Sequence, residues 1–359
     1  MKTNGKIVAL SLLCGAIAFA FASSLYLYKH FTNSSKFEVD GIYYKVETEN
    51  RVAITYRGNS YDAYADEYEG VVIIPENVIY KGINYTVEYI DDFAFKNCGK
   101  MTSIALPPSV QLVGIGAFYG CESLKEIHIS DLSAWCKLSF WSVTDDVGES
   151  PFWYADSLYL NGELITELVV PEDVEEIGSH IFEAYETLKS VILHDGIKSI
   201  HKSAFLYCSN LTEITFSDSI EYIGPYAFKG TAWYENQPDG EIYIGNHLYE
   251  YKGEMPSNTS VVVKEGTEYI CQSAFDCCKG LTRITIPSSI RCIHNYAFCG
   301  CNNLKEIYCK GQTPPYLNNF YSEYHKDVVL YVPKGAKEIY KNGGNMGYFE
   351  NIKEIDFDN

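Results

Sequence analysis

Basic residues are scarce in this sequence: 28 lysines and arginines stand against 47 aspartates and glutamates in 359 residues. The formal net charge of −19 repels phosphate backbones, so the sequence argues against nucleic acid as a partner. The charge favours solubility and carries no information about the fold. Hydrophobic residues make up 47% of the chain, which is enough for a sizeable core.

The motifs of common enzymes and metal sites are also missing. The sequence contains no G-x-S-x-G, H-E-x-x-H or phosphate-binding glycine loop, and no C-x-x-C pair. His201 and His294 occupy the same repeat position, but four coils of a regular stack would separate them by roughly 19 Å. No spacing singles out a catalytic pair of carboxylates. We therefore expect a protein that is not an enzyme and that has no cofactor or metal.

Only one long hydrophobic run occurs, over residues 7–28, which carry no charge. Ala20-Phe21-Ala22 offers a small-residue cleavage site, which predicts a signal peptide over residues 1–22. The run is also long enough to span a bilayer, so an uncleaved anchor is the alternative. A lipid anchor on Cys14 is a third interpretation, although the residues before Cys14 are a poor lipidation signal. Each interpretation places the remaining chain outside the cytoplasm, secreted or attached to the cell envelope.

The dominant feature of the sequence is a repeat of 23 residues. Cys98 and Cys121 are 23 residues apart, as are Cys278 and Cys301. A phenylalanine precedes this position by three residues in seven copies, and an alanine comes before that phenylalanine in all but one. The seven are Phe95, Phe118, Phe182, Phe205, Phe228, Phe275 and Phe298. Repeats of 20 to 50 residues are typical of solenoids, in which stacked coils bury a shared core.

Each copy continues with a strand pattern, L-x-x-I-x-I, in which apolar and polar residues alternate. Pro107, Pro171 and Pro287 follow such strands, as expected for a residue without a backbone donor. The pattern predicts a β-rich solenoid of 23-residue coils with a parallel sheet on its concave side and caps at both ends. About eleven coils would form an array roughly 50 Å long.

The repeat also divides the chain. Residues 23–70 are expected to be a linker and an N-terminal cap, residues 71–310 the solenoid, and residues 311–359 the C-terminal coils and cap. Two insertions interrupt the pattern, near residues 131–160 and 232–256. Insertions of this kind lie along one edge of a solenoid and are often where binding occurs.

Both insertions contain recognisable local signals. Residues 132–138 are predicted to form a short helix capped at its start by Ser130-Asp131, and Asn161-Gly162 is a hairpin turn signal. Residues 242–249 are predicted to form a second hairpin. The aromatic side chains here either anchor a partner or pack against the stack: Trp135, Trp141, Trp153, Trp233 and Tyr234.

The cysteines follow the repeat more closely than a disulfide pattern. Five of the twelve occupy the inward repeat position, where their Cβ vectors point in the same direction: Cys98, Cys121, Cys208, Cys278 and Cys301. They are therefore predicted to be free, buried thiols. One local disulfide among Cys271, Cys277, Cys292 and Cys299 is the alternative.

The outward positions of the strands are the candidate ligand-facing residues, because rigid strands lose little entropy on binding. Glu126, Glu167, Glu213 and Glu306 form an acidic stripe there, either a track for a cationic ligand or calcium, or a solvated face. We expect binding on this face and on the insertions. The side of each coil that carries the Ala-Phe pair is not expected to bind, because these residues are used in core packing. The candidates are Glu126, His128, Glu213, Thr215, Arg283, Thr285, Glu306 and Tyr308.

The spacing L-x-x-I-x-I-P-x-S-I-x-x-I-x-x-x-A-F-x-x-C resembles the BspA-like leucine-rich repeat of bacterial surface proteins, and residues 281–301 match it closely. Residues 37–44 and 330–335 resemble the opening and the C-terminal end of that family. The resemblance implies a leucine-rich-repeat array in a bacterial cell-surface setting. It also implies binding to host matrix proteins or other bacteria, although some members have no known ligand.

These observations predict a non-catalytic cell-surface or secreted protein that holds a host or bacterial surface protein or a glycan. The alternative is a structural spacer of the cell envelope without a specific ligand. Contact with a membrane is expected only through the N-terminal segment, and the chain is expected to be a monomer.

Overall fold

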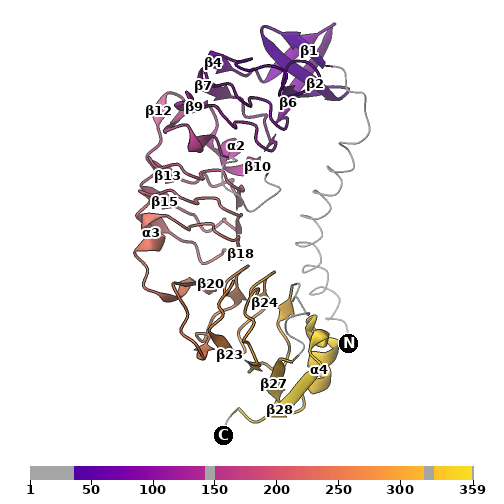
Figure 1. The fold of residues 1–359 in the computed structure, drawn as a ribbon, viewed down its shortest axis with the longest axis vertical. Helices are drawn as coiled ribbons and strands as arrows, with labels where there is room; N and C mark the ends of the chain where they lie inside the picture. The colour runs from indigo at the N-terminus through magenta and orange to yellow at the C-terminus, as the bar shows by residue number, and fades with distance from the viewer. Residues whose placement is uncertain (1–35, 142–149, 319–326, 358–359) are drawn as a thin grey trace.

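The computed structural model describes residues 36–141, 150–318 and 327–357, which form an arc of stacked coils (Figure 1). Within these ranges, no helix has the length and apolar character needed to cross a membrane. The predicted signal peptide at 1–22 and its alternative, the anchor at 7–28, lie outside the described residues.

One longer strand per coil builds the first set of parallel sheets, here called the long strands. In register, Glu167 faces Ser190 and Ser190 faces Glu213, so each coil adds 23 residues, as predicted. The strands form three sheets. The first contains β4 (Gly70–Ile73), β7 (Met101–Leu106), β9 (Glu126–Ile129) and β11 (Ser157–Leu160), with β12 (Glu163–Leu164) antiparallel to β11. The second contains β13 (Glu167–Val169), β15 (Ser190–Ile192) and β17 (Glu213–Thr215). The third contains β21 (Thr259–Val262), β23 (Leu281–Ile286), β25 (Glu306–Cys309), β27 (Val329–Pro333) and β28 (Asn351–Ile355).

Two-residue strands on the opposite side of each coil build the second set of sheets. The second residue of each strand is apolar and buried, which ties this side to the core. The short strands are β8 (Leu112–Val113), β10 (Ser139–Phe140), β14 (Glu176–Ile177), β16 (Ser199–Ile200), β18 (Tyr222–Ile223), β22 (Tyr269–Ile270), β24 (Cys292–Ile293) and β26 (Tyr316–Leu317).

The predicted parallel array is confirmed, but the arc curves in the other direction. In Figure 1, β13 and β15 lie on the outer side of the arc, whereas β18 and β24 lie on its inner side. Both sets of strands are interrupted at the second insertion, because β17 does not pair with β21 and β18 does not pair with β20 (His247–Lys252). On the inner side, Tyr222 reaches His294, with 5.4 Å between the ring centroids. The long strands therefore line the convex side rather than the expected concave side.

The Ala-Phe turns join the two sets of strands and supply the core. Phe205 is fully buried between Phe182 and Phe228, with centroid distances of 5.3 and 5.7 Å. Backbone hydrogen bonds link successive turns, for example from the Phe205 N–H to the Ala227 carbonyl at 2.9 Å. Each turn thus satisfies its own polar backbone through the next coil.

The two ends differ from the regular coils. At the N-terminal end, β1 (Lys36–Val39), β2 (Ile42–Thr48) and β3 (Arg51–Thr55) form an antiparallel meander beside the first short-strand sheet. It joins that sheet through β6 (Ile83–Ile90), which also pairs with β5 (Asn77–Tyr80). At the C-terminal end, α4 (Lys337–Asn342) and η3 (Met346–Tyr348) lie between β27 and β28.

The first insertion contains the predicted short helix, α2 (Leu132–Lys137). The Asp131 carboxylate caps it by accepting a hydrogen bond from the Ala134 N–H at 2.9 Å. A Cβ on Gly178 would lie 1.8 Å from the Leu138 carbonyl oxygen, so only glycine allows this close approach. A short 3-10 helix, η1 (Pro151–Trp153), follows, and β11 and β12 form the hairpin signalled by Asn161-Gly162.

The second insertion contains α3 (Ala232–Glu235) and the predicted hairpin, β19 (Gly240–Ile244) with β20 (His247–Lys252). Most of the aromatic residues proposed as anchors pack against the stack: Trp135 and Tyr234 are buried and Trp141 and Trp233 half-buried, while Trp153 is 37% exposed. The buried hydrophobic residues form two clusters. These clusters meet at Leu248 and Tyr249 in the hairpin.

Candidate interaction surface

The outward side chains of the long strands form what we call the strand face. The strand register arranges them in two rows, one that continues the acidic stripe and one that contains His128, Thr215, Thr285 and Tyr308. The eight candidate residues therefore share one side of the molecule. They fall into three groups, because the three long-strand sheets are separate.

The C-terminal group is occupied by contacts among its own members. The Arg283 guanidinium binds the Glu306 carboxylate at 2.5 Å and lies 5.2 Å from the centroid of the Tyr308 ring. Tyr308 stacks on Tyr331 at 4.4 Å, and Lys353 lies 5.8 Å from the Tyr331 centroid. The two rings are thus enclosed between cations, which leaves little aromatic face for a ligand. Thr285 lies beside this ladder, in register with Tyr308.

The N-terminal group also forms internal contacts. His128 Nε2 lies 3.1 Å from the Glu126 carboxylate, and its ring stacks on Tyr159 at 5.0 Å. Tyr159 is not among the eight strand candidates, because the repeat pattern is interrupted at the first insertion and does not predict its register with β9. The insertion nevertheless returns β11 to the sheet in register with β9, where Tyr159 pairs with His128.

The middle group, on β13, β15 and β17, differs from the other two because its described outward side chains form no ion pair or ring contact. Its first row is Glu167, Ser190 and Glu213, and neither glutamate forms an ion pair with any described residue. Its second row is Val169, Ile192 and Thr215, in which the valine is 60% and the isoleucine 46% exposed. Carboxylates thus stand beside exposed apolar side chains on a rigid sheet.

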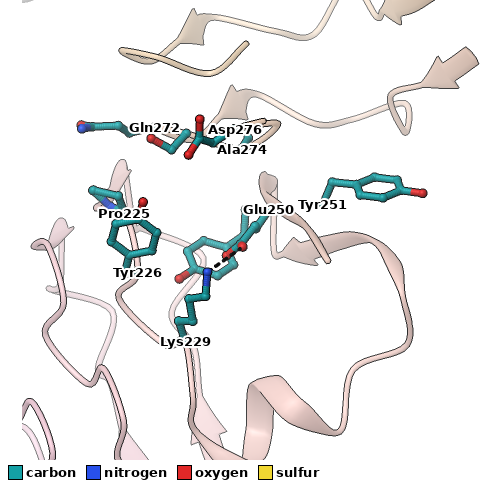
Figure 2. A pocket seen from close by; sticks show the side chains of 10 residues that line it. Pro225, Tyr226, Lys229, Glu250, Tyr251, Gln272, Ala274 and Asp276 are labelled. Carbon is teal, nitrogen blue, oxygen red and sulfur yellow. Dashed lines mark ion pairs between the residues drawn. The ribbon is translucent and has the colours of Figure 1, made fainter. Parts of the chain in front are cut away.

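The Ala-Phe side contains a cavity that the repeat did not predict (Figure 2). The coil with the β19–β20 hairpin lacks an Ala-Phe turn, and Tyr249 takes its place by accepting a hydrogen bond from the Phe228 N–H at 3.1 Å. Lys229 Nζ lies 4.0 Å from the Glu250 carboxylate, and burial raises the pKa of Glu250. The cavity volume of about 80 Å³ is below the 300 Å³ or more typical of small-molecule sites.

The histidines lie closer together than a regular stack predicts. The rings of His201 and His294 both contact Tyr222, at centroid distances of 5.8 and 5.4 Å. The two imidazole rings are therefore closer together than the roughly 19 Å expected for four regular coils. The described residues contain no group of three side chains arranged to hold a metal ion.

The cysteines at the inward repeat position are buried, unpaired thiols. The Cys208 thiol donates a hydrogen bond to the Phe182 carbonyl at 2.9 Å, and Cys121 and Cys301 make the same contact with Phe95 and Phe275. Burial raises the pKa of Cys98 to about 11. Such thiols are poor nucleophiles, so their role is to stabilise the turn rather than to take part in a reaction.

Comparison with known proteins agrees with this architecture. The sequence matches the BspA type leucine rich repeat region in six copies, over residues 77–144, 155–251 and 242–358. No protein with a curated description matches the chain.

Solved structures of similar proteins include a leucine rich cell surface protein from Faecalibacterium prausnitzii. It is 19% identical, with a TM-score of 0.37, and the match covers 90% of this chain and 96% of that one. A leucine-rich repeat protein from Bacteroides ovatus is 20% identical, with a TM-score of 0.30 and coverage of 89% and 100%. The pneumococcal vaccine antigen PcpA is 16% identical, with a TM-score of 0.34 and coverage of 90% and 99%. The family match extends over more than half of the sequence, and the chain belongs to the BspA-type leucine-rich-repeat family.

Proposed function

We propose that this chain is a non-catalytic interaction protein, exposed outside the cytoplasm, that holds a surface protein or a glycan through its strand face. The observation that carries the proposal is the middle group, where Val169 and Ile192 are exposed beside two unpaired glutamates. Folding leaves these apolar side chains in water, and a partner that covers them gains roughly 25 cal/mol per Å² of apolar surface.

The charges of this group indicate which partner fits best. Glu167 and Glu213 flank Ser190 on adjacent strands, and the whole chain carries a net charge of −19. A partner with lysine or arginine beside an apolar residue would match both rows. Electrostatic complementarity would contribute mainly to specificity and to the rate of association.

A structural spacer is the second candidate, and the C-terminal group favours it. Its side chains contact each other and leave little aromatic surface free for a ligand. The contacts run in order through Arg283, Tyr308, Tyr331 and Lys353. A ladder of this kind stiffens the sheet and needs no ligand.

Binding assays on immobilised matrix proteins, mucin and a glycan array would separate these candidates. If any surface binds, Glu167→Lys with Glu213→Lys should weaken binding at least tenfold. The control Glu122→Lys with Glu186→Lys changes the net charge equally at two exposed sites outside the strand face. Equal loss in both variants would indicate non-specific electrostatics, and no binding to any surface would favour the spacer.

A further inference from the structure

Two cysteines differ from all the other described cysteines because their side chains are exposed. Cys277 and Cys299 are solvent-exposed, Cys292 is half-buried, and the remaining eight are buried. A dissolved oxidant must reach a thiol in order to react with it, so these two exposed thiols are expected to react first.

The two exposed thiols lie on adjacent Ala-Phe turns. The Cys277 N–H donates a hydrogen bond to the Cys299 carbonyl at 2.7 Å, one rung of the ladder that joins successive turns. Neighbouring chains in such a ladder are about 4.8 Å apart, which lies within the Cα separation of disulfides.

The side chain of Cys277 also points toward its neighbour. A Cβ on Gly300 would lie 3.1 Å from the Cys277 Sγ, so this thiol extends over the turn that contains Cys299. The glycine, with φ of +70°, leaves the room that the sulfur occupies.

A shared carboxylate places both sulfurs in the same neighbourhood. The Asp276 carboxylate is the main cause that raises the pKa of the Cys277 thiol, and after burial it also raises the pKa of the Cys299 thiol. Both thiols are therefore protonated at neutral pH, which slows thiolate attack without preventing it.

We propose that Cys277 and Cys299 form a reversible disulfide site that cross-links two adjacent turns in the presence of a small disulfide oxidant. The site does not depend on the proposed function. The inward thiols of the same turns, Cys278 and Cys301, are excluded because they are buried.

The reaction is a thiol–disulfide exchange with oxidised glutathione as the oxidant. One protein thiolate attacks a sulfur of oxidised glutathione, forms a mixed disulfide and releases one glutathione thiolate. The second protein thiolate attacks the protein sulfur of the mixed disulfide and releases the second glutathione. The two protein thiols lose two electrons and two protons in total, and two reduced glutathione molecules receive them.

The test treats the full chain with oxidised glutathione at pH 8, alkylates the remaining thiols in denaturant, and maps the peptides without reduction. We expect one intramolecular link and ten alkylated cysteines out of twelve. Cys277→Ser and Cys299→Ser should each abolish the link, whereas the control Cys292→Ser, at a half-buried site, should preserve it. Cys277 and Cys299 are exposed, so replacing either one leaves the core untouched.

A second measurement distinguishes this site from incidental oxidation. Asp276→Asn removes the carboxylate beside both thiols and should accelerate link formation at pH 7 at least threefold. The proposal is overturned if twelve cysteines are alkylated after oxidation, or if the link joins any other pair. A disulfide-linked dimer as the sole product would also overturn it.

Discussion

The cysteine of the repeat has a structural role that composition alone conceals. Its thiol donates to the carbonyl of the phenylalanine one coil earlier, as Cys208 does to Phe182 at 2.9 Å. That carbonyl would otherwise have one fewer partner in a buried turn. A small apolar residue with a weak donor fits this position better than serine, whose hydroxyl costs more to bury.

Replacing Phe205 with alanine should show how much one core position contributes. The ring is fully buried between Phe182 and Phe228, so Phe205→Ala leaves a cavity that reaches three coils. We expect the free energy of unfolding to fall by about 3–5 kcal/mol. Urea denaturation measures this, with the exposed Glu186→Ala as control. A loss below about 1 kcal/mol would contradict the assigned register.

The buried thiols should label slowly in the native protein. Cys98, Cys121, Cys208 and Cys301 are at most 1% exposed, and burial raises the pKa of each. A thiol reagent should therefore modify them at least tenfold more slowly than Cys277 and Cys299 in the native state. Mass spectrometry of partly labelled protein gives the order, and three or more disulfides in the untreated protein would contradict it.

At the scale of elements, local signals in the sequence predicted much of the structure. Asp131 as a helix cap and Asn161-Gly162 as a turn act over a few residues, so both are readable without tertiary information. The direction of curvature could not be predicted from the sequence. The alternation of apolar and polar residues distinguishes inward from outward side chains, but it does not show whether the outward side is convex or concave. The division of the candidate residues into three groups could not be predicted from the sequence either. It depends on which long strands do not pair, such as β17 and β21.

The β19–β20 hairpin buries a histidine that should make stability depend on pH. His247 is 1% exposed and stacks on Tyr269 at 4.6 Å, and burial lowers its pKa to about 4 from 6.5. The unfolded chain therefore binds this proton more readily than the folded chain. Its contribution is fully present above pH 6.5 and is lost as the pH falls from 6.5 to about 4.

The size of this effect follows from the shift, on the order of 3 kcal/mol for His247 between the two pH values. His294, whose pKa burial lowers to about 4, adds a similar trend. Urea denaturation at pH 7 and pH 4.5 measures the difference. His247→Asn should reduce this difference in the free energy of unfolding. An unchanged pH dependence in His247→Asn would show that this imidazole is protonated in the folded state.

At the scale of the whole molecule, the stack is less uniform than its repeat. The hydrophobic residues divide into two clusters, one within residues 37–249 together with Cys271, and the other within residues 248–352. The division occurs at the coil that has a hairpin in place of an Ala-Phe turn. In a solenoid each coil stabilises only its neighbours, so an irregular coil is the natural place for cooperativity to weaken.

Tyr249 should therefore couple the two halves unequally. Its ring belongs to the first cluster and its hydroxyl accepts the Phe228 N–H at 3.1 Å, so Tyr249→Phe leaves a buried donor without its acceptor. We expect the opening free energy of the Phe182 and Phe205 amides to fall by about 1–3 kcal/mol. The Phe275 and Cys277 amides, which belong to the second half, should change by less than about 0.5 kcal/mol. Native-state hydrogen exchange in low urea resolves both sets. Equal losses on both sides of the hairpin would mean that the arc unfolds as one cooperative unit despite its divided core.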